Sequence, residues 1–262
     1  MVTLNLKVLN AAGQILAEST GENRVELCYL GNYAEGDQIV LTSSEHPVHL
    51  YWQVDDALGS SLCYLTKDMT YTVPFAEKKR VYSPEAFAGA KHFLFAQVAE
   101  PWQTKLYRNL AINVDDQHRV EGCYPHADAN VETRGESVFE AKNAIDGVCG
   151  NHGHGNWPYA SWGINRDPNA CMKLDFGRTV QIDRIGICLR ADFPHDSYWT
   201  EGTVTFSDGS VEVLPFNKTD RTQYFSIAQR QVQWLTFDKL IKAEDESPFP
   251  ALTQIEVYGT DL

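Results

Sequence analysis

The segment TVTFSDGSVEVLPF, residues 203–216, restricts the fold of this chain more strongly than any other. Two runs of alternating apolar and polar residues flank Ser-Asp-Gly-Ser, and Asp-Gly is a favoured pair for a tight turn between antiparallel strands. A period of two places alternate side chains on opposite faces of a strand. The segment therefore predicts a β-hairpin with one buried face.

Similar runs recur along the whole chain. In the first hundred residues they are LNLKVLN, RVELCYL, QIVLTS, VHLYWQV, SLCYL, YTVPF and HFLFAQVA, and further on they are CMKLDFG, QIDRIGICLRAD, QYFSI, QVQWLTFDKLI and LTQIEVYG. Short helical turns are predicted at SPEAFAGA (83–90), which begins with Ser and Pro, and at SVFEAKNAIDG (137–147), which ends at a glycine. We predict an all-β fold with two β-sandwich domains, residues 1–104 and 105–262, because strands do not alternate here with helices.

The charge and the apolar pattern narrow the classes of partner. The formal net charge of the 262 residues is −13, so a nucleic acid or an anionic membrane surface would be repelled. No apolar run reaches the roughly 20 residues that span a bilayer, and the opening MVTLNLKVLNAAG resembles a strand rather than a signal peptide. We therefore expect a cytoplasmic protein that uses neither partner and binds a neutral, hydroxyl-rich ligand.

The distribution of the six cysteines is typical of a protein from a reducing compartment. They are scattered without the CxxC spacing that is typical of zinc sites and redox motifs. Cys188 lies in the apolar run IGICL and is predicted to be buried, whereas Cys149 and Cys171 fall near predicted loops. We expect reduced cysteines.

Five short segments in the second part occur in an order that resembles a known family. They are AKNAIDG, SW, KLDFGRTVQIDRIGICLRAD, FSDGS and LTQIEVYG, between residues 141 and 259. Together they resemble the discoidin family, which includes the coagulation-factor type C domains and the family 32 carbohydrate-binding modules. The similarity runs from about Tyr107 to the C-terminus. It implies a galactose-binding-like jelly-roll sandwich with ligand loops at one end, and no such resemblance extends to the first part.

The resemblance also implies a structural calcium ion. In the family, carbonyls around the short helix, the Asp of Asp-Gly and an acidic residue before the last strand hold it. Asp146 matches the first of these side chains, but Gln254 stands where the acidic residue is usual. An amide oxygen brings no charge and hard cations favour carboxylates, so calcium binding at Asp146 and Gln254 stays open.

A loop insertion separates Asp146 from the Trp that closes the family motif. This insertion, NHGHGNWPYASW (151–162), and a second segment, LRADFPHDSYW (189–199), are rich in side chains that bind sugars. Arginine donates to hydroxyl oxygens, carboxylates accept from hydroxyl protons, and aromatic faces stack on pyranose rings. The predicted ligand residues are His152, His154, Trp157, Tyr159, Arg190, Asp192, His195, Asp196, Tyr198 and Trp199.

Other interpretations of these residues stay open. Arg190 and Asp192 could form an ion pair at a strand end, Trp199 could belong to the core, and Trp162 is predicted to be core. His152, His154 and His195 would match the three-ligand count of a catalytic zinc site, although no rigid helix carries them.

We predict non-catalytic, lectin-like binding of a neutral mono- or oligosaccharide by the discoidin-like part. The alternatives are a metal-assisted sugar-processing enzyme that uses the three histidines, and a protein-interaction module whose N-terminal sandwich docks a protein partner.

Overall fold

Two stacked sheets form the first sandwich. The computed structural model describes residues 1–191 and 197–262. One sheet has the order β2-β1-β4-β7 and the other β10-β6-β5-β8-β3. The strands are β1 (Thr3–Leu9), β2 (Ile15–Glu22), β3 (Arg24–Tyr29), β4 (Gln38–Ser43), β5 (Val48–Gln53), β6 (Ser61–Leu65), β7 (Met69–Thr72), β8 (His92–Val98) and β10 (Cys123–Tyr124). All are paired antiparallel, as the short alternating runs predict.

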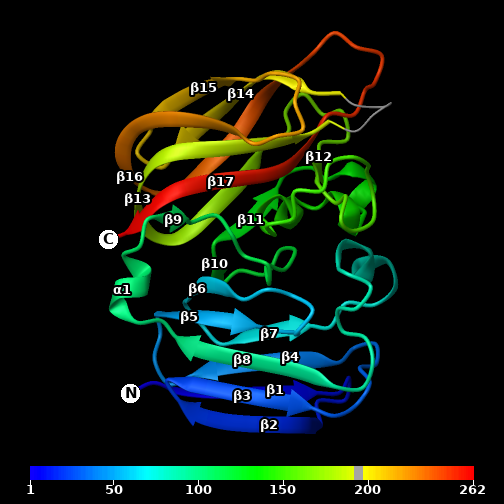
Figure 1. Cartoon of the computed structure of the whole chain (residues 1–262), viewed down its shortest axis with the longest axis vertical. Coiled ribbons are helices and arrows are strands. Elements are labelled where there is room, and N and C mark those ends of the chain that lie inside the picture. Colours follow the sequence, from blue (N-terminus) through cyan, green and yellow to red (C-terminus); the bar gives the residue numbers. More distant parts are fainter. Residues whose placement is uncertain (192–196) are drawn as a thin grey trace.

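The second sandwich lies above the first in Figure 1. Its strands follow the order β12-β17-β13-β16-β14-β15, with β11 on β13 and β9 on β17. Their bounds are β9 (Arg108–Asn109), β11 (His126–Ala129), β12 (Trp162–Gly163), β13 (Met172–Arg190), β14 (Trp199–Phe206), β15 (Val211–Pro215), β16 (Gln223–Lys242) and β17 (Ala251–Asp261). The predicted hairpin is confirmed, because β14 and β15 pair antiparallel across Asp208 and Gly209.

The helical segments are all short. They are η1 (Ala76–Val81), α1 (Pro101–Thr104), η2 (Thr133–Gly135), η3 (Ser137–Phe139) and η4 (Ala141–Ile145). The predicted helical turn near residue 140 is thus two 3-10 segments that end at Asp146. None of the helices in the described residues is long and apolar enough to cross a membrane.

The long antiparallel pair β13 and β16 bends, so that its two halves belong to different layers of the second sandwich. Their antiparallel register is interrupted between Asp175 and Val180, so that Asp175 pairs with Trp234 and Val180 with Val232. Gly177 lies in the interruption with φ of +65°, and a Cβ there would lie 2.3 Å from the Tyr124 ring. Glycine is required at this bend by both its backbone and its neighbour.

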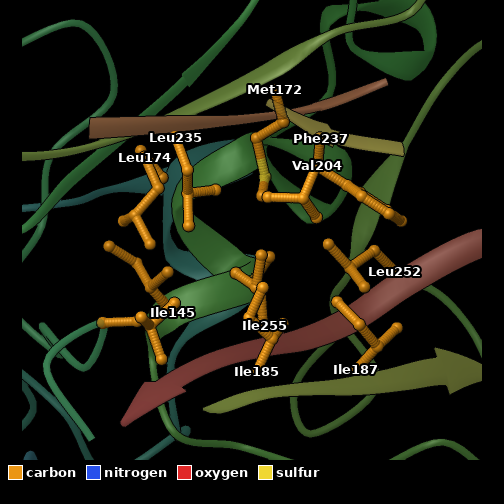
Figure 2. Close-up of a cluster of buried hydrophobic side chains, with 14 of the residues drawn as sticks. Ile145, Met172, Leu174, Ile185, Ile187, Val204, Leu235, Phe237, Leu252 and Ile255 are labelled. Carbon is orange, nitrogen blue, oxygen red and sulfur yellow. The ribbon is translucent and has the colours of Figure 1, made fainter. Parts of the chain in front are cut away.

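Side chains of the two layers face each other and form the core. Figure 2 shows Met172, Leu174 and Leu235 on one side of this core and Ile185 and Ile255 on the other. All five are fully buried, and they belong to a cluster that is separate from the buried cluster of the first sandwich. The all-β prediction with two sandwiches is confirmed. The exact boundary at residues 104 and 105 stays a prediction, since β10 joins the first sandwich from beyond it.

Candidate functional site

A cavity of about 560 Å³ opens at the loop end of the second sandwich. This end carries β12 and the loop before β17, and it lies opposite the C-terminus in Figure 1. The described residues that line this loop-end cavity are Thr133, Arg134, Phe139, His154, Gly163, Ile164, Asn165, Arg166, Arg190, Glu246, Ser247, Pro248, Phe249, Pro250 and Ala251. They come from five separate chain segments, which only the tertiary fold brings together.

Arg190 contributes a buried guanidinium to the wall of the loop-end cavity. It is the last residue of β13, where it pairs with Ala251 at the start of β17. The side chain is only 5% exposed, and its Nη2 donates a hydrogen bond to the Phe249 carbonyl at 2.8 Å. A guanidinium has five N–H donors in a fixed planar arrangement, which suits it to bind oxygen atoms.

Aromatic rings and further guanidiniums form the rim. The Arg134 guanidinium lies 5.5 Å from the centre of the Phe139 ring, and that of Arg166 lies 5.2 Å from the Phe249 ring. Phe249 is 43% exposed and stands between Pro248 and Pro250. Because proline fixes φ, the two flanking prolines restrict the loop that presents this ring.

Three non-glycine residues on the cavity wall have left-handed backbone conformations. The φ angles are +56° at Arg134, +48° at Asn165 and +62° at Arg166. Such a conformation costs a non-glycine residue about 1 kcal/mol or more, and such residues cluster at functional sites. A hydrogen bond from Asn165 N–H to Thr133 Oγ1, 2.9 Å long, ties two of the lining segments together.

The insertion loop at residues 151–162 contributes to two different places. His154 lines the loop-end cavity, whereas Trp157 lines a second cavity of about 180 Å³ between the two sandwiches. The Trp157 N–H donates to the Arg80 carbonyl at 2.8 Å, and Arg80 Nε donates to Asn156 Oδ1 at 2.8 Å. The loop is therefore docked on the first sandwich, and the structure does not bring Trp157 and Arg190 into one site.

The other predicted ligand residues are dispersed. Tyr159 is partly exposed and packs on Gly153, where a Cβ would lie 3.2 Å from its ring. Tyr198 is half-buried against the core. Trp199 is fully buried, 6.5 Å from the Trp162 ring, so it offers no face to a ligand, and the core interpretation holds. Trp162 is buried as predicted. The predicted residues Asp192, His195 and Asp196 lie outside the described residues.

The two described histidines of the metal hypothesis point to different neighbours. His152 is exposed, with its Nδ1 3.7 Å from Asp220 Oδ2, while His154 lines the loop-end cavity. Within the described ranges, two groups could share an ion, namely Asp55 with Asp56 and His92, and His118 with Asp128 and Glu132. Neither group includes a histidine of the insertion. In both groups the imidazole already lies near a carboxylate, at 3.2 Å for Asp55 and 2.8 Å for Glu132.

The residues that match the family's calcium position form a hydrogen-bonded clamp around an amide. Gln254 Nε2 donates to the Asn143 carbonyl and to Asp146 Oδ1, both at 2.7 Å, and to the Val148 carbonyl at 3.3 Å. Its Oε1 accepts from Gly147 N–H at 3.0 Å, which fixes the orientation of the amide. A calcium ion requires acceptor oxygens directed at it. Here an N–H donor group faces those oxygens instead, so this geometry does not fit the ion.

The cavity residues Phe249, Arg166 and Arg134 were not predicted from the sequence. A signal for Phe249 exists in ESPFP (246–250), because an aromatic residue between two prolines is typical of a shaped loop. The two arginines lie in loops without periodicity, and no local pattern places them beside Arg190.

The fold and the loop-end cavity define a β-sandwich module with a ligand-sized hollow at one end. No protein-family model and no curated protein matches the sequence. Several solved structures match between half and three fifths of the chain, and they are carbohydrate-binding modules, as the sequence resemblance indicates.

One is chitosan-binding module 1 of a chitosanase/glucanase from Paenibacillus sp. IK-5, in a selenomethionine-labelled mutant form, with 17% identity. The match covers 59% of this chain and 100% of that one, with a TM-score of 0.39. The family 32 module of C. perfringens NanJ, in complex with galactose, has 16% identity over 50% and 91% of the two chains and a TM-score of 0.38. A Streptococcus pneumoniae fucose-binding module has 11% identity over 58% and 98%, with a TM-score of 0.42.

Proposed function

We propose that this protein binds a carbohydrate in the loop-end cavity without transforming it. The observation that carries the proposal is the buried guanidinium of Arg190 in the wall of the loop-end cavity. Aromatic rings lie at the rim of the same cavity. A sugar presents hydroxyl oxygens on its edges and apolar C–H groups on its faces. Guanidinium donors bind the oxygens, and an aromatic ring covers the apolar face.

The volume and the charges of the cavity support a mono- or oligosaccharide as the ligand. Ligand pockets typically have volumes of about 300–1,000 Å³, and the loop-end cavity of about 560 Å³ falls in this range. Glycoside hydrolysis generally requires a pair of carboxyl groups that flank the scissile bond. Among the described residues that line the cavity, Glu246 is the one carboxylate, which supports binding rather than hydrolysis.

The left-handed residues of the wall support a site that is prepared before the ligand arrives. Arg134, Asn165 and Arg166 adopt costly conformations that the surrounding contacts maintain. A preorganised wall lowers the entropy that is lost on binding. This arrangement favours a rigid ligand that makes a few directed contacts.

Titration of a glycan panel against Arg190→Ala tests the proposal. A hydrogen bond to a charged group contributes roughly 1.5–3 kcal/mol, so we expect a loss of about tenfold or more in affinity. Arg184→Ala is the matched control, because Arg184 lies on the same strand but is exposed outside the cavity lining. Calorimetry gives the affinities, and circular dichroism checks that each variant is folded.

Two further variants locate the site independently of Arg190. Phe249→Ala removes an exposed ring of the rim and should weaken binding, whereas Trp157→Ala changes the other cavity and should bind like the wild type. Normal affinity in both Arg190→Ala and Phe249→Ala would contradict the proposed site. A loss of affinity confined to Trp157→Ala would move the site to the cavity between the sandwiches.

A further inference from the structure

Two carboxylates and a histidine meet at one end of the first sandwich. Asp55 and Asp56 follow the end of β5, and His92 is the first residue of β8, which pairs antiparallel with β5. Because the end of one antiparallel strand lies beside the beginning of its partner, this pairing brings the three residues together. One nitrogen or carboxylate oxygen of each residue lies within 4.8 Å of those of the other two. Imidazole nitrogen and carboxylate oxygen are ligands of zinc in proteins.

The hydrogen bonds of His92 direct its Nδ1 at a carboxylate. The side chain is fully buried, and its Nε2 lies 3.2 Å from the Gly89 carbonyl, to which it can only donate. In a neutral imidazole the other nitrogen then carries a lone pair. This nitrogen, Nδ1, lies 3.2 Å from Asp55 Oδ2. Two acceptor atoms that face each other in this way require a proton or a metal ion between them.

The separation of these two atoms favours the metal ion. A charged imidazolium–carboxylate hydrogen bond is typically about 2.7–2.9 Å long, and the buried pair His126 Nδ1 and Asp116 Oδ1 of this chain has 2.7 Å. The 3.2 Å between His92 and Asp55 is longer. Two atoms bound to one zinc ion at about 2.0–2.2 Å, at a tetrahedral angle, lie roughly 3.3 Å apart. The observed separation therefore matches two neighbouring ligands of one ion.

Backbone groups orient the three side chains. Asp55 Oδ1 accepts from the Ala57 N–H at 2.9 Å, while its Oδ2 faces His92. Asp56 Oδ1 accepts from the Phe93 N–H at 3.3 Å. The bond from His92 Nε2 to a backbone carbonyl is the usual support of a metal-bound imidazole. Asp56 is exposed, so an ion can enter from solvent.

A buried hydroxyl beside the three side chains is an independent sign of a ligand. Tyr33, in the loop after β3, is 8% exposed, and its Oη has no hydrogen-bond partner among the residues that the structure describes. The centre of its ring lies 4.3 Å from that of the His92 ring. A buried hydroxyl without a partner is unfavourable for folding, and a bound ion or its water ligand would supply the missing contact.

We propose that Asp55, Asp56 and His92 bind a divalent transition-metal ion, for which zinc is the expected occupant, with the Tyr33 hydroxyl beside it. Calcium and magnesium prefer oxygen ligands, whereas imidazole suits zinc, so the histidine selects between these ions. The ion would join the loop after β5 to the beginning of β8. The site lies in the first sandwich and does not depend on the proposed carbohydrate binding in the second.

Titration with zinc chloride tests the inference on folded protein from which metal ions have first been removed by chelation and dialysis. Calorimetry should show a saturable site for one zinc ion per chain, and elemental analysis after gel filtration should recover that ion. The melting temperature should rise with the zinc concentration, because the ion binds the folded site. Calcium in place of zinc should give no rise, so the test is separate from any calcium ion at Asp146.

Two substitutions remove ligands. Asp56→Asn is the main variant, because Asp56 is exposed and the amide keeps an acceptor oxygen for the Phe93 N–H. Its zinc affinity should fall by at least about tenfold, since the loss of a supporting contact alone typically costs that much. His92→Phe keeps a ring beside Tyr33 and should abolish binding. Circular dichroism checks that each variant is folded, and Asp56→Asn decides the test if His92→Phe is not.

The matched controls are His118→Ala and His152→Ala. His118 belongs to the other group of ligand-type side chains, and His152 lies in the insertion loop. Both variants should bind zinc like the wild type. Unchanged affinity in folded Asp56→Asn would overturn the inference, and so would a loss confined to either control. A wild type that binds no zinc would also overturn it and would leave His92 as the charged partner of Asp55.

Discussion

Asp146 shows how one residue links the end of η4, the turn that follows it and the last strand. Its Oδ1 accepts from the Val148 N–H and from Gln254 Nε2, both at 2.7 Å. Burial raises the pKa of the Asp146 carboxyl to about 7, although these hydrogen bonds and the nearby Lys142 ammonium lower it. The desolvation of the charged form therefore outweighs the contacts that favour it.

This raised pKa predicts a pH dependence of stability. Between the ordinary value of 3.8 and about 7, the folded state binds the proton of Asp146 more tightly than the unfolded state. The contribution of this proton to the free energy of unfolding is present at low pH and is lost as the pH rises through this window. In Asp146→Asn, whose side chain keeps an acceptor oxygen, stability should fall less across the window. Denaturant unfolding measured at several pH values checks this, and parallel curves for the two proteins would contradict it.

At the scale of elements, β17 holds the turn after η4 in place through hydrogen bonds of a neutral amide, the side chain of Gln254. Gln254 makes four hydrogen bonds, one to Asn143 in η4 and three to Asp146, Gly147 and Val148 in the turn that follows it. A structural calcium, which the resemblance implies, would require acceptor oxygens, whereas the Gln254 amide nitrogen donates to the oxygens of Asn143, Asp146 and Val148. We therefore infer that the turn is held without a metal ion.

Chelation provides the test of this metal-free clamp. The melting temperature of the wild type should be the same in EDTA and in calcium. In Gln254→Glu a carboxylate replaces the donor amide and faces the Asp146 carboxylate and two carbonyl oxygens, so the variant should be less stable in EDTA and should recover in calcium. Gln254→Ala is the control, because it removes the amide without adding a ligand. A wild type that is destabilised by EDTA would show that the clamp needs an ion.

At the scale of the whole molecule, an ion-pair network at the C-terminus connects the two sandwiches. The buried Asp261 accepts from Arg108 and from Arg178, each at 2.6 Å, and lies 3.5 Å from His49 on β5 of the first sandwich. The Arg178 guanidinium also lies 5.3 Å from the centre of the Tyr64 ring, on β6. Contacts near the other end, such as Ser137 N–H to Glu77 Oε1 at 2.7 Å, join the same two bodies. We therefore expect the sandwiches to unfold together.

Asp261→Asn tests this coupling. Removing one partner of a buried ion pair costs roughly 3–5 kcal/mol, because the other charge stays buried. The free energy of unfolding should fall by about this amount, with one transition seen both by calorimetry and by tryptophan fluorescence. Burial by itself would raise the pKa of Asp261, but the charges and hydrogen bonds of Arg178 and Arg108 lower it below its usual value. The contribution of the network is therefore present above about pH 4 and is lost as the pH falls through the folded value. Two separate thermal transitions in the wild type would contradict the coupling.

The sequence by itself determined the strands, the hairpin and the class of fold. Alternation in LNLKV and TVTFSDGSVEV depends on neighbours two residues apart, and the structure confirms both as strands. It did not show that CMKLDFG and QIDRIGICLRAD are one long strand, since the bend at Gly177 interrupts the pattern. The core position of Trp162 also followed from its motif, and its side chain is fully buried.

Only the tertiary structure decided which loop residues meet. Trp157 and His154 are three residues apart in one glycine-rich loop, yet they line different cavities because the loop docks on Arg80 of the first sandwich. Phe249 joins Arg190 because β17 pairs with β13 and carries the preceding loop to the same end. A loop has no repeating period, so its side chains are directed by contacts with segments that are distant in the sequence. Periodicity therefore predicts the elements, whereas the composition of the site depends on how those elements are packed.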